Sequence, residues 1–254
     1  MDIFDAVILG IVEGITEFLP ISSTGHMILS AKLMGLEQTQ FLKTFEVAIQ
    51  LGSILAIVVM YFKKLLDSRA LWFKLLIGFV PTGILGLTLY KSIKGFFSPS
   101  VVAYMLIVGG VVFLLVEKFY RCEDYRIEKV EDVSYKQAFL IGLFQSLAMI
   151  PGTSRSGSTI IGGLLLGLSR KCSAEFSFLL AIPTMFAATF YDVYKNHSLF
   201  QSSHMEYLLI GGVVAFLTSL VVIKMFMKFI SAFTYVGFGI YRILIGGIFL
   251  LWVL

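Results

Sequence analysis

Two glutamates, Glu13 and Glu17, stand four residues apart in an otherwise apolar stretch near the N-terminus. In a helix this spacing places both carboxylates on one face. An ionisable side chain within an apolar segment is costly and usually serves a function. Two like charges at this distance favour a cation between them, and carboxylate oxygens suit Mg²⁺ or Ca²⁺. We therefore treat the pair as candidate ligands of a divalent cation, with local capping or ion pairing as the alternative.

A cluster of polar residues follows the two glutamates and comprises Ser22, Ser23, Thr24, Gly25 and His26. A hydroxyl just before a helix is an ordinary N-cap, which explains any one of them. The free N–H groups at a helix start also attract anions. A histidine beside them can act as an acid, a base or a nucleophile. The cluster therefore indicates an anion site as well as a helix start.

A second polar cluster lies in the other half of the chain and comprises Thr153, Ser154, Arg155, Ser156 and Gly157. Arg155 is far from the end of any apolar stretch, and a buried arginine needs an anionic partner. Its planar guanidinium can hold two phosphate oxygens at once. A structural ion pair with Glu13 or Glu17 is the alternative, and the two interpretations are compatible.

Together these groups suit a substrate that carries several negative charges. A diphosphate fits, because phosphoryl transfer depends above all on positioning and on neutralising charge. The apolar surroundings suit a lipid tail. Taken alone, the residues do not distinguish hydrolysis of a lipid diphosphate from its transport.

The chain around these residues is too apolar for a soluble protein. Of its 254 residues 58% are hydrophobic and 14% are charged, and the mean hydropathy is +0.91. Soluble domains carry about 25% charged residues. The net charge of +4 then relates to membrane orientation rather than to nucleic acid. Cys122 and Cys172 have no zinc-site spacing, and the N-terminus lacks the features of a cleaved signal peptide.

Six stretches are long and apolar enough to cross a bilayer. They cover about 44–62, 71–90, 100–118, 174–191, 207–227 and 235–254. Two further apolar segments, 3–34 and 135–168, are interrupted by what we call the first break (residues 19–26) and the second break (residues 150–157). Irregular backbone at membrane depth must be enclosed by protein or water. We therefore expect each segment to form a re-entrant helical hairpin.

The chain divides into two similar halves. Residues 6–13 resemble 138–145, and residues 107–111 resemble 244–248. We expect an all-α polytopic membrane protein, a single integral membrane domain over 1–254. Six transmembrane helices and two re-entrant helical hairpins form an inverted repeat of halves 1–119 and 135–254, joined by a charged cytoplasmic linker over 120–134. Such repeats place a binding site near the membrane midplane.

Lysines and arginines are distributed unevenly in this arrangement. One side contains thirteen of them, within 63–74, 118–136, 168–173 and 224–234. The other side contains five, namely Lys32, Lys43, Lys91, Lys94 and Lys195. The positive-inside rule makes the first side cytoplasmic, so both termini and the mouth of the first hairpin face outward. The second hairpin then enters from the cytoplasm, and both cysteines lie in a reducing compartment, where no disulfide is expected.

Four further polar residues are open candidates for the walls of the same cavity. These are Glu46, Gln50, Gln145 and Arg242. Gln145 occupies the repeat position of Glu13. For Arg242, a structural pairing or snorkelling toward the interface is an equal alternative.

The two motifs resemble the signature regions of the bacterial undecaprenyl-diphosphate phosphatase family, also called the bacitracin resistance protein family. The first reads Glu-Gly-Ile-Thr-Glu-Phe-Leu-Pro-Ile-Ser-Ser-Thr-Gly-His at 13–26, and the second reads Pro-Gly-Thr-Ser-Arg-Ser-Gly at 151–157. The resemblance covers essentially the whole chain, and the family has Glu or Gln at the position of Glu13.

This resemblance implies an enzyme that removes the terminal phosphate of undecaprenyl diphosphate and so regenerates the monophosphate carrier for peptidoglycan synthesis. It implies a bacterial plasma membrane protein that depends on a divalent cation and opens its site to the outer face, in agreement with the lysine and arginine distribution. It transfers the functional residues of the family to Glu13, Glu17, Ser23, Thr24, His26, Ser154, Arg155 and Ser156.

We expect catalytic roles for Glu17, Ser23, His26 and Arg155, and cation binding by Glu13 and Glu17 with Mg²⁺ or Ca²⁺. The expected substrate-binding residues are Ser22, Thr24, Gly25, Thr153, Ser154, Ser156 and Gly157. The nucleophile stays open between Ser23, His26 and a water molecule.

The expected partners are a polyprenyl diphosphate and membrane lipids, not nucleic acid, and a homodimer stays open. The main alternative function is a flippase or transporter of the lipid carrier, since inverted repeats are common in transporters. A purely structural scaffold would leave the buried glutamates and the arginine unexplained.

Overall fold

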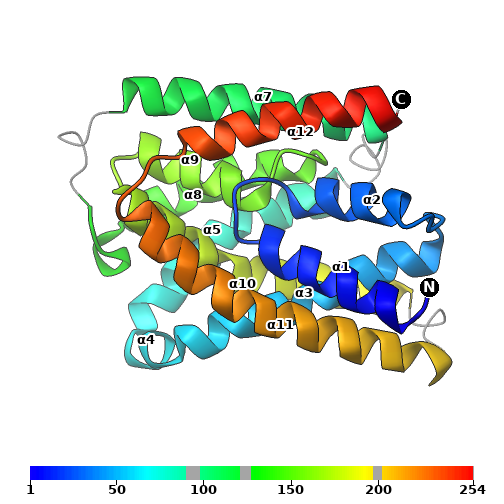
Figure 1. The fold of residues 1–254 in the computed structure, drawn as a ribbon. Coiled ribbons are helices and arrows are strands. Elements are labelled where there is room, and N and C mark those ends of the chain that lie inside the picture. The colour runs from blue at the N-terminus through cyan, green and yellow to red at the C-terminus, as the bar shows by residue number, and fades with distance from the viewer. Residues whose placement is uncertain (90–97, 121–126, 197–201, 254) are drawn as a thin grey trace.

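The computed structural model describes residues 1–89, 98–120, 127–196 and 202–253, and these are almost entirely helical. Figure 1 shows the helices α1 (Ile3–Thr16), α2 (Ser23–Leu33), α3 (Gln40–Met60), α4 (Phe62–Asp67), α5 (Arg69–Thr88), α7 (Pro99–Phe119), α8 (Tyr135–Ser146), α9 (Arg155–Leu165), α10 (Arg170–Lys195), α11 (Ser202–Ile230) and α12 (Val236–Val253). Two 3₁₀ turns complete them, η2 (Val130–Asp132) and η3 (Leu147–Met149).

Within the described ranges, five helices are long and apolar enough to cross a membrane: α3, α5, α7, α10 and α11. They coincide with five of the six predicted spans. The sixth predicted span coincides with α12, where Val236–Leu251 is a shorter apolar helix. The predicted span end at 90, Lys91, Lys94, Cys122 and part of the 120–134 linker lie outside the described residues.

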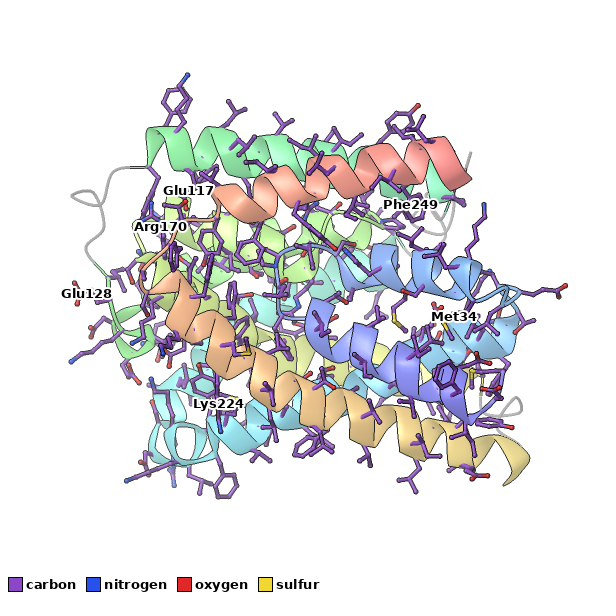
Figure 2. All side chains as sticks on the ribbon, viewed as in Figure 1. Met34, Glu117, Glu128, Arg170, Lys224 and Phe249 are labelled. Carbon is purple, nitrogen blue, oxygen red and sulfur yellow. The ribbon has the colours of Figure 1, made fainter. Side chains whose placement is uncertain are left out.

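The outer faces of these helices are apolar, as the side chains in Figure 2 indicate. Large hydrophobic side chains such as Leu87, Leu209, Val221 and Leu251 are more than half exposed. A soluble protein rarely exposes so much contiguous apolar surface. The chain is therefore a multi-pass membrane protein.

Each predicted break joins two short helices. The turn after α1 leads into α2, and the turn after η3 leads into α9, while α1 packs on α2 and α8 packs on α9. The irregular backbone is shorter than the predicted breaks, because α2 begins at Ser23 and α9 begins at Arg155. The residue before each of these helices, Ser22 or Ser154, caps its N-terminus through the side-chain hydroxyl.

The helices of the two halves pack reciprocally. α1 lies against α11 while α8 lies against α5, and α3 pairs with α10 as α7 pairs with α12. Figure 1 shows α7 and α12 side by side along one edge of the molecule. Glycines permit the close crossings: Gly10 faces the carbonyl of Gly211, and Gly142 faces the carbonyl of Gly78. Each hairpin is thereby held by the opposite half of the chain.

Both chain termini lie at one end of the molecule, on the right in Figure 1. Glu117, Arg170 and Lys224 lie at the opposite end, as their labels in Figure 2 show. There Arg170 binds Glu117 through two hydrogen bonds of 2.9 and 2.6 Å. The N–H of Tyr235 donates to the same carboxylate at 2.9 Å, which ties the start of α12 to α7 and α10.

Candidate active site

A cavity of about 230 Å³ lies where the two breaks meet. From the breaks and their flanks its walls receive Glu17, Ser22, Ser23, Thr24, Ser154 and Arg155. From the long helices and α8 they receive Gln50, Thr82, Gln145 and Thr184. Apolar residues complete the walls, namely Ala148, Met149, Pro151, Met185 and Ala188, so the cavity has both polar and apolar surface.

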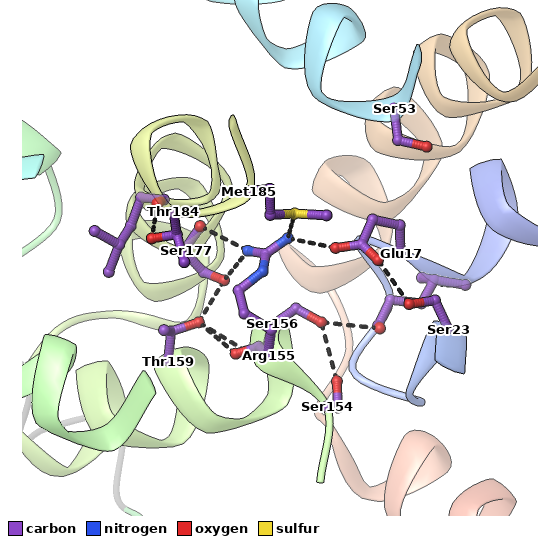
Figure 3. Close-up of polar contacts among 12 residues, drawn as sticks. Glu17, Ser23, Ser53, Ser154, Arg155, Ser156, Thr159, Ser177, Thr184 and Met185 are labelled. Atoms are coloured by element: carbon purple, nitrogen blue, oxygen red, sulfur yellow. Dashed lines mark hydrogen bonds and ion pairs between the residues drawn. The ribbon is translucent and has the colours of Figure 1, made fainter. Parts of the chain in front are cut away.

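An ion pair between Glu17 and Arg155 joins the two halves of the chain at this cavity. Nη2 of Arg155 donates to Oε1 of Glu17 at 2.9 Å, across a separation of 138 residues. Glu17 follows the last residue of α1, and Arg155 is the first residue of α9. Figure 3 shows the guanidinium between Ser177 and Glu17. The prediction that the two breaks bring acidic and guanidinium groups together is confirmed.

The second carboxylate oxygen of Glu17 binds a hydroxyl from its own hairpin. Oγ of Ser23, the first residue of α2, donates to Oε2 of Glu17 at 2.6 Å. A hydroxyl that already donates to a carboxylate has a base at hand to take its proton. Glu17 therefore links the hydroxyl of Ser23 in one hairpin to the guanidinium of Arg155 in the other.

The remaining donors of Arg155 are only partly used. Nη1 donates to the carbonyl of Ser177 at 3.0 Å, and Nη2 lies 3.5 Å from Sδ of Met185. Its Nε is buried and has no hydrogen-bond partner among the described residues. The guanidinium also lies 5.9 Å from the ring centre of Phe18. The side chain is thus oriented by α10 and Phe18, yet keeps a donor for another acceptor.

His26 is not among the residues that line this cavity. Its Nδ1 donates to the carbonyl of Ser22 at 2.8 Å, and its Nε2 lies 2.8 Å from the hydroxyl of Tyr241. Because Nδ1 carries the proton, the neutral ring accepts at Nε2 from the tyrosine. The two rings also stack, with centres 5.6 Å apart. In this arrangement Nδ1 bonds the N-cap of α2 itself, and only Nε2 joins α2 to α12.

Glu13 does not line the cavity and is fully buried. Neither of its carboxylate oxygens has a hydrogen-bond partner within the described part of the chain. A buried carboxylate without a partner is strongly unfavourable, so its two oxygens suit a bound cation. No group of three or more His, Cys, Asp or Glu side chains in the described ranges could hold a metal alone. Mg²⁺ commonly binds only one or two carboxylates and takes its other ligands from phosphate and water.

The other predicted binding residues lie around the cavity rather than in it. Oγ of Ser156 donates to the carbonyl of Leu19 at 3.0 Å and so joins the second break to the first. The N–H groups of Gly25 and Gly157 donate to the capping serines. Oγ1 of Thr153 is buried and finds no partner among the residues described. Of the predicted site residues, the structure brings Glu17, Ser22, Ser23, Thr24, Ser154 and Arg155 to the cavity wall. Those that do not line it are Glu13, Gly25, His26, Thr153, Ser156 and Gly157.

Arg242 also lies outside the cavity and is fully buried. Its guanidinium donates to backbone carbonyls of both breaks and of α7, namely Pro20, Gly152, Thr153, Met105 and Leu106, at 3.0 to 3.3 Å. The structural alternative therefore applies to this residue. It fixes the two breaks against each other and against α7.

Two polar residues of the cavity wall, Thr82 and Thr184, were not predicted from the sequence. Each directly follows a proline inside a long helix, Pro81 in α5 and Pro183 in α10. Of the open candidates, Gln50 and Gln145 line the cavity, whereas Glu46 is outside its walls and accepts from Gln38 at 3.3 Å. A Pro-Thr pair in the middle of an apolar span was the available signal, because proline frees backbone groups that polar side chains must satisfy.

The sequence also matches known proteins over its whole length. A family model described as "Bacitracin resistance protein BacA" matches residues 6–248. A protein named undecaprenyl-diphosphatase from Campylobacter fetus is 62% identical, and the alignment covers 100% of both chains. Proteins of the same name from Persephonella marina and from a Sulfurihydrogenibium species are 60% and 59% identical, covering 100% and 99% of this chain and 100% of each relative.

Proposed function

Because the chain belongs to the bacitracin resistance protein BacA family, we infer that it is an undecaprenyl-diphosphatase. It is a membrane hydrolase that acts on the diphosphate of a polyprenyl lipid and releases the lipid monophosphate. The observation that carries this function in the structure is the contact of Glu17 with both Arg155 and Ser23 at one cavity. The family favours hydrolysis over transport of the lipid carrier.

Arg155 binds the terminal phosphoryl group of the substrate in the proposed mechanism. Its unused Nε donor and the ion pair with Glu17 support this assignment. Phosphate oxygens compete with Glu17 for the guanidinium, since a guanidinium binds phosphate in a bidentate manner. The hydroxyls of Ser22, Thr24 and Ser154 line the same cavity and are further phosphate ligands. Release of Glu17 from the arginine leaves its carboxylate free to accept the proton of Ser23.

Ser23 is the nucleophile and Glu17 the general base in this mechanism. The hydroxyl of Ser23 loses its proton to Glu17, and its oxygen bonds to the terminal phosphorus. The bond from that phosphorus to the bridging oxygen breaks, and the lipid monophosphate leaves with the electron pair. Water then attacks the phosphoserine and releases inorganic phosphate. His26 is a positioning residue here, because both of its ring nitrogens are engaged with Ser22 and Tyr241.

A divalent cation, Mg²⁺ or Ca²⁺, would be held by Glu13 and Glu17. The unpartnered oxygens of Glu13 support this site. The cation would neutralise charge on the phosphate oxygens when bound. Direct attack by water is the alternative to Ser23, and a phosphorylated Ser23 that is trapped in acid distinguishes the two routes.

We place the chain in the bacterial plasma membrane as six transmembrane helices and two re-entrant hairpins, an inverted repeat with its site open to the outer face. The reciprocal packing of the halves and the common end of both termini support this topology. A Cys122→Ser, Cys172→Ser background with either Glu37→Cys or Asp67→Cys tests it. An impermeant thiol reagent should label only the Glu37→Cys variant in intact cells. Labelling of Asp67→Cys from outside would reverse the orientation.

Phosphate release by the purified protein in detergent tests the function itself. The wild type with a polyprenyl diphosphate and Mg²⁺ should release phosphate, whereas a pure transporter needs a sealed membrane and releases none. Glu17→Ala and Arg155→Ala should abolish turnover while the protein elutes as a folded species. Thr88→Ala is the matched control, because the Thr88 hydroxyl is exposed and donates only within its own helix. Near-normal turnover in either cavity variant would overturn the assignment of these residues.

A further inference from the structure

Gln145 of α8 is held in one orientation at the wall of the cavity. It is 1% exposed, and its Nε2 donates to the hydroxyls of Thr82 and Thr184, both at 3.0 Å. Those hydroxyls donate in turn to carbonyls, Thr82 to Gly142 at 3.2 Å and Thr184 to Leu180 at 2.9 Å. Both amide protons of Gln145 are thus assigned to acceptors, and the direction of its carbonyl follows.

The carbonyl oxygen of Gln145 has no donor within the described residues. Turning the amide over would bring this oxygen to the two threonine hydroxyls, but a hydroxyl could donate to it only by giving up its bond to the carbonyl of Gly142 or Leu180. A buried acceptor without a donor is costly, so the fixed Oε1 indicates a missing hydrogen-bond donor. An ionised phosphate offers only acceptors to this oxygen. Water is the donor that the reaction itself requires.

We propose that Gln145 positions the hydrolytic water, because Thr82 and Thr184 hold the amide of this residue, which lines the cavity of Ser23 and Arg155 and has a buried carbonyl oxygen without a donor among the described residues. The proposal rests on the proposed function and concerns its second step. The water donates one O–H to Oε1 of Gln145 and directs a lone pair toward the phosphorus. Its oxygen bonds to the phosphorus of phosphorylated Ser23, and the bond from phosphorus to Oγ breaks.

The protons of this step balance. The proton that Glu17 took from Ser23 in the first step has passed to solvent. One proton of the attacking water then moves by way of Glu17 to Oγ of Ser23, and the other stays on the released phosphate. Gln145 accepts a hydrogen bond from the proton that stays. An uncharged amide suits this place, since it accepts the hydrogen bond without adding a further negative charge to the one that Glu17 already brings beside the phosphoryl group.

The second half of the chain thus contributes a neutral residue where the first half has Glu13. Gln145 takes the repeat position of Glu13. Glu13 does not line the cavity and has no partner among the described residues, whereas Gln145 does line it. The two halves thus have equivalent helices but different chemistry at this position: Glu13 in the first half would bind a cation, and Gln145 in the second half would bind water.

Gln145→Leu tests the proposal, because leucine keeps much of the volume and removes the acceptor. The purified variant in detergent is mixed with a polyprenyl diphosphate and Mg²⁺, and lipid monophosphate and inorganic phosphate are measured from the first turnover onward. We expect one equivalent of lipid monophosphate per enzyme at nearly the wild-type rate. Inorganic phosphate should then appear about 100-fold more slowly, because the water is no longer oriented. Phosphorylated Ser23 should accumulate.

Competition between water and an alcohol gives a readout that misfolding cannot mimic. Methanol can accept the phosphoryl group in place of water and forms methyl phosphate. In Gln145→Leu the ratio of methyl phosphate to inorganic phosphate should rise at least about tenfold over the wild type, since only water is positioned by the amide. Thr184→Val, which removes an acceptor of Nε2 but keeps Gln145, should raise the ratio less.

Failure of this proposal differs visibly from failure of the proposed function. If the wild type releases no phosphate, the hydrolase assignment itself is wrong. If the wild type is active but both Gln145→Leu and Thr184→Val keep the wild-type product ratio, Gln145 does not position the water. A first turnover of Gln145→Leu that slows as much as phosphate release would also overturn the proposal, because the first step does not use water.

Discussion

Ser22 and Ser154 adopt the same left-handed backbone conformation, with φ of 72° and 76°, directly before the two helices that carry the site. Among the described residues other than glycine, only these two have a positive φ. Such a conformation costs about 1–3 kcal/mol for a residue with a side chain and often marks a functional turn. The next residues are Ser23 and Arg155, so the two strained turns lead directly into two residues that line one cavity.

Substitutions at Ser154 should separate the helix cap from the backbone strain. Its Oγ accepts from the N–H of Gly157 at 3.1 Å. Ser154→Ala removes this cap, worth about 1–2 kcal/mol, and keeps the strained φ. Ser154→Gly also removes the cap but relieves the strain, so it should lower the thermal midpoint in detergent less. Ser22→Ala should cost less than Ser154→Ala, because the equivalent bond to Gly25 is 3.4 Å. The opposite order of Ala and Gly would show that the turn is not strained.

A lysine cannot replace Arg155. The guanidinium spans from the carbonyl of Ser177 to the carboxylate of Glu17, and a single ammonium cannot reach both in the same geometry. Arg155→Lys should therefore lower kcat/KM for the lipid diphosphate about 100-fold or more, as expected for loss of a transition-state donor. Added guanidinium should restore part of the activity of Arg155→Ala. If the lysine variant kept the wild-type kcat/KM, catalysis would not depend on a side chain that contacts both Ser177 and Glu17.

Glu13→Gln should separate cation binding from stability. If Glu13 is a ligand, the concentration of Mg²⁺ or Ca²⁺ that gives half-maximal activity should rise, because an amide oxygen binds a divalent cation less strongly than a carboxylate. In chelator the thermal midpoint should stay equal or rise, since a neutral amide replaces a buried carboxylate without a partner. A cation titration on both proteins measures the first effect. An unchanged cation dependence would remove Glu13 from the proposed cation site.

The sequence was sufficient to predict that Glu17 and Arg155 meet, because each is a charge inside an apolar segment and such charges must find one another. It could not place His26, whose Nε2 contacts the hydroxyl of Tyr241 and which is not among the residues that line the cavity. That contact links residues 215 positions apart, and nothing local in the sequence indicates it. Thr82 and Thr184 were missed because a lone hydroxyl in an apolar span usually bonds its own helix.

Helix starts could be predicted from neighbouring residues, whereas the packing of helices against one another could not. Capping hydroxyls are local, so the starts of α2 and α9 follow from Ser22 and Ser154. Which helix covers which hairpin depends on close approach between residues far apart, such as Gly10 with Gly211. These crossings became visible only in the structure.

Glycines at one of the crossings should respond unequally to the same substitution. A Cβ on Gly52 would collide with the backbone carbonyl of Gly212, whereas a Cβ on Gly212 would meet nothing within 4 Å. Gly52→Ala must therefore move α3 away from α11 and should lower the thermal midpoint strongly. Gly212→Ala should be near neutral or slightly stabilising, because alanine favours a helix by about 1 kcal/mol over glycine. Equal effects of the two substitutions would mean that α3 and α11 do not cross here as closely as described.

Arg242 should contribute more to stability than any single ion pair on the surface. The carbonyls of Pro20, Gly152 and Thr153 lie outside the helices, so no helix ladder satisfies them, and Arg242 donates to all three at 3.0 Å. Arg242→Met fills much of the space but leaves these acceptors unpaired, at about 1–3 kcal/mol for each. The thermal midpoint in detergent should therefore fall far more than for Tyr241→Phe, which removes one hydrogen bond from the same helix.

Arg242→Lys distinguishes the hydrogen bonds from the positive charge. Lysine keeps the charge but is a compact donor that cannot reach both breaks and α7 together. It should recover only part of the stability lost in Arg242→Met, and the remaining activity of both variants should fall with the fraction of folded protein. Full recovery by lysine would mean that charge alone matters at this position, and that the guanidinium does not fix the two breaks against each other.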